Sequence, residues 1–289
     1  MIPEAAALSP QEIARRSRSN FLASFMFLER RRRAALSTIY AFCRAVDDAA
    51  DDPEDPAEAR EQLAFWRAEL ARVPDGQPET ATGQALAGVV RDFGTSTAHL
   101  ADVLDGVSMD VEPEPFATLE ELDGYCHKVA SAVGLACLPV FGARGPEADR
   151  YARELGLALQ LTNILRDLRR DHEEGRVYVP TEHLERHRVD PDWLGGGGPA
   201  EVYRDGGPVA ALVADLGAVA TERFANTAAL LPADQHRELL PAEVMAAIYA
   251  ELLDVVLARR GRLDDPRRPR VSRRRKLWIL ARTWWRGRR

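Results

Sequence analysis

Asn163-Ile-Leu-Arg-Asp167-Leu-Arg-Arg-Asp171 is the most informative stretch of this sequence. Read as a helix, it places Asn163, Asp167 and Asp171 at four-residue intervals, so their oxygens line one face about one turn apart. The same spacing recurs far upstream, where Asp47 and Asp51 lie at the end of another predicted helix. The chain therefore carries two ladders of carboxylates on predicted helices.

These ladders predict either a divalent cation or a solvated face. Like charges at this spacing cost a helix roughly 0.2–0.5 kcal/mol per pair, and acidic residues at a helix C-terminus also oppose the helix dipole. Mg²⁺ prefers oxygen ligands and usually joins one or two carboxylates to the phosphates of a substrate. Two sparse ladders suit that habit, so we expect Mg²⁺, with Mn²⁺ as a substitute, bound by Asp47, Asp51, Asn163, Asp167 and Asp171.

The rest of the chain predicts an all-α fold. Apolar residues recur at helical spacing, and two capping boxes, Ser9-Pro-Gln-Glu12 and Thr118-Leu-Glu-Glu121, mark helix starts. No period-two strand pattern is visible. The glycines at 195–198 lack the lysine and the preceding strand of a phosphate loop, so they predict a flexible connection. We expect helices over residues 34–51, 57–73, 84–108 (one or two), 118–138, 147–170, 208–231 and 241–260.

Length and composition narrow the class of protein further. At 289 residues the chain is long enough for one large domain with a substantial core. Its three cysteines include no Cys-x-x-Cys, which indicates neither a disulfide framework nor a thiolate zinc site. The opening residues lack the pattern of a signal peptide, and no stretch approaches the roughly 20 apolar residues that cross a bilayer. We therefore expect a cytoplasmic protein without a transmembrane helix.

The C-terminal tail differs in charge from the rest of the chain. Residues 259–289 carry fourteen basic residues against two aspartates, a net charge of +12 that leaves −18 on residues 1–258. Within it, Lys276-Leu-Trp-Ile-Leu-Ala-Arg-Thr-Trp-Trp285 interleaves apolar residues with arginine, which suits an anionic membrane surface. We expect peripheral binding to the inner face of the cytoplasmic membrane. A disordered solubilising tail is the alternative, and no nucleic-acid-binding motif surrounds the tail.

Three ordered motifs resemble the squalene/phytoene synthase family. Tyr40-Ala-Phe-Cys-Arg-Ala-Val-Asp-Asp-Ala-Ala-Asp51 is similar to the first aspartate motif, and the stretch 163–180, with its Gly-Arg-x-Tyr-x-Pro flap, is similar to the second. Tyr125-Cys-His-Lys-Val-Ala-Ser-Ala-Val-Gly134 resembles the segment that lines the family's cavity. The resemblance spans nearly the whole chain. It implies a single-domain, isoprenoid-synthase-like helical bundle around a central cavity, formed by residues 1–265, followed by a basic amphipathic tail over 266–289.

The resemblance also implies which residues hold the substrate. Arg44 and Arg176 are expected to contact diphosphate. Tyr125 or Tyr178, or the released diphosphate, is expected to assist proton loss, and a purely structural role is the alternative for each tyrosine. The small side chains of residues 130–136 either leave space for a ligand or pack tightly against another helix. The expected substrate-binding residues are Ser17, Ser19, Phe21, Phe25, Tyr40, Arg44, Val129, Val133, Gln160, Asn163 and Arg176, and the two phenylalanines are alternatively core residues.

Within the family, the motifs look most like those of bacterial presqualene diphosphate synthases of the hopanoid route. That likeness implies head-to-head condensation of two farnesyl diphosphates without NADPH, with enzymes of the downstream hopanoid pathway as partners and no nucleic acid. Three alternatives stay open. They are phytoene synthesis from geranylgeranyl diphosphate, complete NADPH-dependent squalene synthesis, and a helical, membrane-peripheral binding protein whose acidic ladders are solvated.

Overall fold

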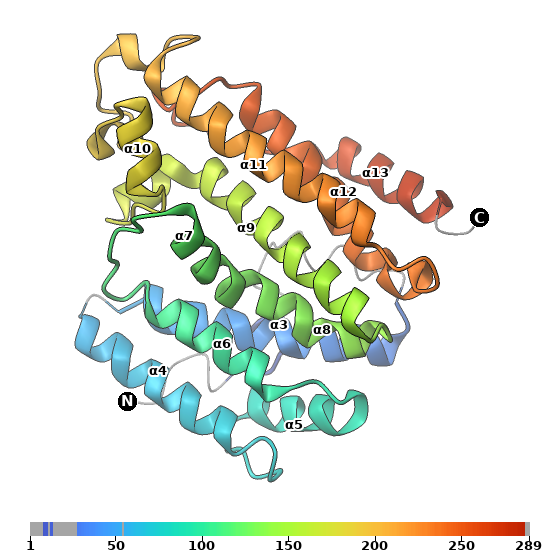
Figure 1. Ribbon diagram of the computed structural model, residues 1–289. Helices are drawn as coiled ribbons and strands as arrows, with labels where there is room; N and C mark the ends of the chain where they lie inside the picture. Colours follow the sequence, from blue (N-terminus) through green and yellow to red (C-terminus); the bar gives the residue numbers. More distant parts are fainter. Residues whose placement is uncertain (1–7, 11, 14–27, 54, 287–289) are drawn as a thin grey trace.

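Helices make up all the regular structure in the described part of this computed structural model, residues 8–10, 12–13, 28–53 and 55–286 (Figure 1). The all-α prediction is thereby confirmed for those residues. The predicted Ser17, Ser19, Phe21 and Phe25 lie outside them. In chain order the elements are α3 (Arg30–Asp51), α4 (Pro56–Ala71), α5 (Ala81–Phe93), α6 (Thr97–Ser108), α7 (Leu119–Cys126), η3 (His127–Ser131), α8 (Ala132–Phe141), α9 (Pro146–Glu173), α10 (Thr181–His187), η4 (Pro191–Gly195), η5 (Ala200–Tyr203), α11 (Pro208–Leu230), α12 (His236–Leu257) and α13 (Arg273–Arg286).

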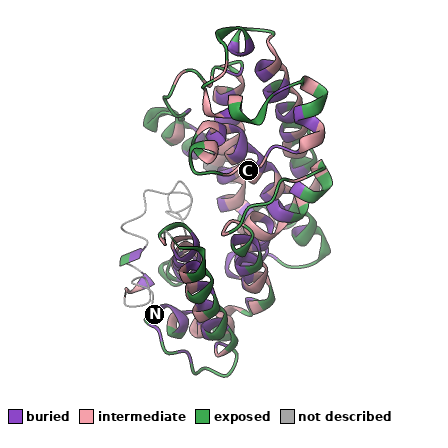
Figure 2. Ribbon diagram, turned by 90° about the vertical axis from the view of Figure 1, so that its left-hand side faces the viewer, coloured by how far each residue is buried: buried purple, intermediate pink, exposed green. Residues whose placement is uncertain are grey.

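Helix α9 runs through the middle of the bundle (Figure 1). It starts with a proline at its first position and acidic residues in its first turn, which favour a helix N-terminus. α11 and α12 pack on one side of α9, and α7, η3 and α8 pack on the other, where both α3 and α6 contact α8. Buried residues lie where the helices face one another, and exposed residues cover the outside (Figure 2). The central helix thus carries the second carboxylate ladder into the interior.

Most predicted helices have the expected extent. The segment 84–108 forms two helices, because Gly94 takes a left-handed φ of 77° and ends the first of them. The predicted start of α12 at Pro241 is wrong: the helix begins at His236. Pro241 is buried, as is Leu239, so packing of this turn outweighs the backbone hydrogen bond that a proline cannot donate. The glycines of residues 195–198 form an ordered turn, in which the Gly198 N–H donates to the Tyr203 hydroxyl (2.8 Å).

The run α7, η3 and α8 differs from the prediction in two ways. Its middle, His127–Ser131, is a π-helical turn that the apolar periodicity did not signal. In addition, Leu119–Phe141 is long and apolar enough by composition to span a membrane, which corrects the expectation that no stretch comes close. More than half of its most apolar window, 56%, is buried inside the bundle against α9, α6 and α3. That burial identifies the run as a core helix of the bundle.

Candidate active site

An apolar cavity of about 270 Å³ lies between α3, η3, α8, α9 and α12. Five residues expected to bind substrate line it together, although they come from four separate elements: Tyr40, Val129, Val133, Gln160 and Asn163. Leu155 and Leu159 of α9 and Met245 of α12 add apolar surface to the same walls. The structure therefore brings distant parts of the sequence around one hydrophobic space.

The cavity reaches toward both carboxylate ladders. Its lining includes Cys43, which lies one helical turn before Asp47, and Asn163, which lies one turn before Asp167. An elongated apolar ligand in the cavity would thus have one end near two sets of acidic side chains. This arrangement suits a ligand with a long hydrocarbon chain and a charged head group.

The small residues of the central segment both leave space and pack tightly. Ala130 and Gly134 line the cavity, and a β-carbon at Gly134 would meet only ordinary contacts with Ala152. On the next turn Ser131 is buried against Gly156 of α9, where an added β-carbon would lie 2.4 Å from the Ser131 Cα. Both alternatives that the sequence left open are therefore realised, on different residues of the same segment.

The first ladder occupies the last turn of α3. Burial raises the pKa of Asp47 to about 7, and the charges of Asp51 and Asp48 add to this rise although Arg44 opposes it. Arg44, the expected diphosphate contact, forms an ion pair with Asp48. Asp51 is more exposed and accepts a hydrogen bond from Arg176 (2.7 Å). One of the two predicted ligands is thus paired with a guanidinium, and the other is held in a site that disfavours its charge.

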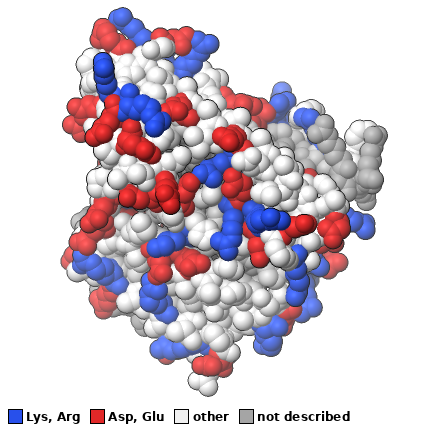
Figure 3. Space-filling view, viewed as in Figure 1, with Lys and Arg blue, Asp and Glu red and all other residues white. Residues whose placement is uncertain are grey.

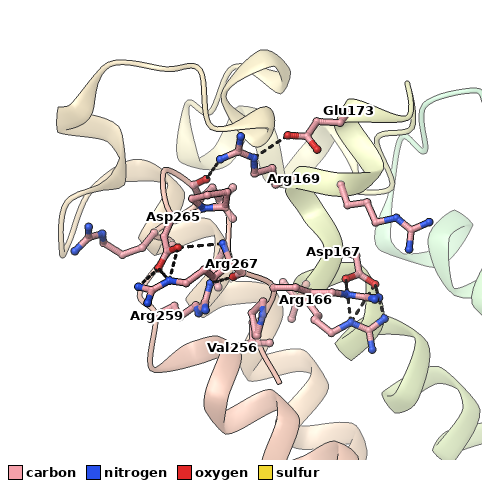
Figure 4. Close-up of a pocket in the computed structure, with 17 residues that line it drawn as sticks. Arg166, Asp167, Arg169, Glu173, Val256, Arg259, Asp265 and Arg267 are labelled. Atoms are coloured by element: carbon pink, nitrogen blue, oxygen red, sulfur yellow. Dashed lines mark hydrogen bonds and ion pairs between the residues drawn. The ribbon is translucent and has the colours of Figure 1, made fainter. Parts of the chain in front are cut away.

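The second ladder also combines one carboxylate that is bound by arginine with one whose charge is disfavoured. Burial would raise the pKa of Asp167, but hydrogen bonds from Arg166 and Arg268 hold it below its ordinary value. Arg268 binds both carboxylate oxygens at 2.6 Å, and Arg166 approaches from the same helix (Figure 4). Asp171 has a pKa raised to about 7, chiefly by burial and then by the charge of Asp167. Neither Arg166 nor Arg268 was predicted as a site residue, because nothing in the basic runs distinguishes them from their neighbours.

Arg176 connects the two ladders. The turn before it contains Gly175 with a left-handed φ of 79°, and the Arg176 N–H donates to the Asp171 carbonyl (2.7 Å). Its guanidinium then reaches across to Asp51 of α3. Acidic and basic side chains are interspersed over the face of the molecule that Figure 3 shows. The predicted phosphate contact therefore lies between the two predicted groups of metal ligands.

Asp110 joins the two predicted tyrosines. The Tyr125 hydroxyl donates to one carboxylate oxygen of Asp110 (2.9 Å), and the Tyr178 hydroxyl donates to the other (2.8 Å). The two rings stack at 5.2 Å between centroids. Burial, together with the charge of Asp110, raises the pKa of both phenols, so both stay protonated. The sequence analysis gave Asp110 no role, since no spacing connects it with either tyrosine.

The fit of a divalent cation depends on the oxygen donors that the two ladders offer. Among the described residues, no three His, Cys, Asp or Glu side chains converge in the geometry of a metal site. Two observations nevertheless fit a divalent-cation site. The Asn163 Oδ1 atom is buried without a hydrogen-bond partner in the described structure, and Asp47 and Asp171 both sit where a nearby positive charge would favour their ionised forms. Oxygen donors of this kind are those that Mg²⁺ prefers.

A helical bundle whose apolar cavity ends at two acidic helix segments defines an all-α, isoprenoid-synthase-like fold. A solved structure, a dehydrosqualene synthase in complex with ligand, superimposes with a TM-score of 0.83 and 28% sequence identity, covering 96% of this chain and 95% of that one. A squalene synthase from Alicyclobacillus acidocaldarius, at 23% identity and a TM-score of 0.69, shares the fold.

The sequence comparisons identify the family. The squalene/phytoene synthase family matches over residues 14–275, so the chain belongs to it. The presqualene diphosphate synthase of Zymomonas mobilis is 35% identical over 91% of this chain and 88% of its own length. The phytoene synthase of Mycobacterium tuberculosis is 37% identical over an aligned segment of 176 residues. This segment covers 61% of this chain and only 58% of that relative.

Proposed function

We propose that this protein catalyses the head-to-head condensation of two prenyl diphosphates. The observation that carries the proposal is the apolar cavity that reaches toward both carboxylate ladders through Cys43 and Asn163. Such a space accommodates a prenyl chain and directs its diphosphate toward the acidic and basic side chains. Membership of the squalene/phytoene synthase family supports the same reaction class.

The residues of the site have separable roles in this proposal. Asp47, Asp51, Asn163, Asp167 and Asp171 would hold Mg²⁺, which supplies positive charge to the departing diphosphate when bound. Arg44 and Arg176, together with Arg166 and Arg268, offer guanidinium groups whose planar forks match phosphate oxygens. The apolar walls exclude water, which would otherwise quench the carbocation left on the prenyl chain.

In this proposal the tyrosine pair assists proton loss from the substrate cation. Both phenols are kept neutral, so neither acts as a phenolate base. A tyrosine oxygen would instead accept the proton lost by the substrate cation while its own hydroxyl proton moves to the Asp110 oxygen that it already contacts. Burial also raises the pKa of Asp110, although the tyrosine hydrogen bonds oppose that rise, and the higher pKa makes this carboxylate a better proton acceptor.

Farnesyl diphosphate is the proposed substrate and presqualene diphosphate the proposed product. Relatives named presqualene diphosphate synthase that align with most of this chain support that choice. The reaction would then precede enzymes of the hopanoid pathway and would need no NADPH. Geranylgeranyl diphosphate is the competing substrate, because relatives named phytoene synthase also match.

Product analysis separates these possibilities. Purified protein is incubated with Mg²⁺ and farnesyl diphosphate, first without and then with NADPH, and the products are identified by mass spectrometry. We expect a cyclopropyl C30 diphosphate without NADPH and no squalene after NADPH is added. Phytoene from the C20 substrate, with no product from farnesyl diphosphate, would replace the substrate assignment. Failure to release diphosphate from either substrate would refute the enzyme assignment.

A further inference from the structure

The outer face of α13 carries an unusual density of exposed apolar side chains. Leu277, Trp278 and Trp285 are 62%, 48% and 62% exposed. Among the described residues the only other large hydrophobic side chain exposed to a comparable degree is Met109, at 36%. The three residues of α13 lie at i, i+1 and i+8, so they share one side of the helix. Exposed apolar surface gathered in this way marks an interaction surface.

The opposite face of α13 is fixed to the body of the protein. Ile279 and Leu280 are buried against Val244 and Ile248 of α12. Arg275 also forms an ion pair with Glu251 of α12 (2.9 Å). α13 therefore lies along the outside of the bundle as a packed helix (Figure 1), and the exposure of Trp278 and Trp285 is not due to a detached tail.

Arginines surround the exposed apolar residues. Arg274 and Arg282 lie on the same side of α13 as Leu277 and Trp278, because residues three, four and seven apart share a helix face. The guanidinium groups of Arg275 and Arg282 lie 4.6 and 5.1 Å from the Trp278 ring centroid. The described part of α13 contains no acidic residue. This surface therefore combines positive charge with amphipathic aromatic rings.

We propose that the exposed face of α13 binds the surface of an anionic lipid bilayer. Leucine and tryptophan would enter the boundary between head groups and acyl chains, and the arginines would contact the anionic head groups. Charge complementarity favours this partner. The body of the chain, residues 1–258, carries −18 and would be repelled by such a membrane, so the basic helix sets the orientation in which the protein docks.

Docking through α13 would also place the substrate cavity close to the membrane. One face of α12 packs against α13 through Val244 and Ile248, and the neighbouring face of α12 lines the cavity through Met245 and Tyr249. Of the described elements, only α13 and α12 thus separate the cavity from the proposed membrane surface on this side of the bundle. This part of the inference rests on the proposed function, because a lipophilic substrate or product would partition into the membrane.

Flotation of the full-length protein with lipid vesicles tests the proposal. Vesicles of equal parts phosphatidylcholine and phosphatidylglycerol are compared with phosphatidylcholine alone. We expect binding to the anionic vesicles only. The double variant L277S/W278S should reduce binding at least about tenfold, because two exposed apolar side chains no longer enter the bilayer. The variant M109S removes an exposed hydrophobic residue elsewhere and should bind as the unaltered protein does.

A second pair of variants tests the charges. R274Q/R282Q should weaken binding by about fivefold for each arginine removed. R150Q/R204Q changes the net charge equally on other elements and should have little effect. Equal binding to neutral vesicles, or no loss in either α13 variant, would overturn the proposal. A DNA duplex that displaces the protein from anionic vesicles would assign the face to nucleic acid instead. Vesicle binding is measured without turnover, so its failure would leave the proposed enzyme activity untouched.

Discussion

Replacing Asp47 with Asn should stabilise the metal-free protein while it abolishes most activity. Asp47 is held in α3 where burial and neighbouring carboxylates disfavour its charge. It has no hydrogen bond or ion pair with any other described residue, whereas Asp51, one turn away, is bound by Arg176. Asparagine is nearly isosteric and uncharged, so it removes the unfavourable charge without opening a cavity.

The magnitude follows from the two pKa values. The carboxyl has an ordinary pKa of 3.8 and a folded-state pKa of about 7, a rise of about 3 units. At about 1.4 kcal/mol per unit, the ionised form destabilises the fold by at most about 4 kcal/mol. This penalty is fully present above pH 7, decreases as the pH falls from 7 toward 4, and is absent below the unfolded pKa. Because the neighbouring carboxylates share it, we expect D47N to gain about 1–3 kcal/mol at pH 8.

Urea unfolding in the presence of a chelator measures this gain at pH 8 and pH 5. The advantage of D47N should be large at pH 8 and clearly smaller at pH 5, where the unaltered protein is itself largely protonated at this position. D51N is the matched control. It removes a carboxylate from the same ladder but leaves Arg176 without its partner, so it should give no gain. A D47N protein that is less stable than the unaltered one at pH 8 would refute the reasoning.

Two further substitutions test the residues that the sequence did not predict. R268Q removes both hydrogen bonds that Arg268 donates to Asp167 and should lower the free energy of unfolding by about 1–2 kcal/mol. R267Q removes a side chain that binds Asp265 on the exposed surface and should leave the free energy of unfolding nearly unchanged. Equal effects in urea unfolding would contradict this assignment. D110N keeps an acceptor for one tyrosine but loses the carboxylate charge, so turnover should fall by a factor of about 10² or more in a diphosphate-release assay, and unchanged turnover would exclude the proton relay.

The sequence predicted which helices carry the acidic residues of the site, but it did not predict which side chains pair with those residues. Helical spacing placed Asp47 and Asp51 in the last turn of α3, and Asp167 and Asp171 near the end of α9, as the structure has them. Such regularities depend only on local geometry, which a single helix determines. The motif resemblance added that these helices face a common space, and Arg176 connects them directly.

The sequence pattern could not predict contacts between segments that are far apart in the chain. Arg268 follows Asp167 by 101 residues and lies in a basic run. No feature of the sequence distinguishes it from the other arginines of that run. Asp110 and Tyr178 are 68 residues apart, and their hydrogen bond depends on how α6 and the flap after α9 meet in the folded chain. The π-helical turn at His127–Ser131 was missed for a related reason: it carries no change in composition. Tertiary packing determines each of these features.

The two ladders have the same arrangement of carboxylates, and this arrangement affects how the site would bind a cation. In each ladder one carboxylate is neutralised by arginine, Asp51 by Arg176 and Asp167 by Arg268, and the other has a pKa near 7. These ion pairs limit the repulsion between the carboxylates within each ladder. The side chains of Asp47 and Asp171 have no hydrogen bond or ion pair with another described residue, and they carry a negative charge only once they lose their protons. If Asp47 and Asp171 hold a divalent cation, as proposed above, protons would compete with it for these two groups near neutral pH, because a ligand must be deprotonated before it binds metal.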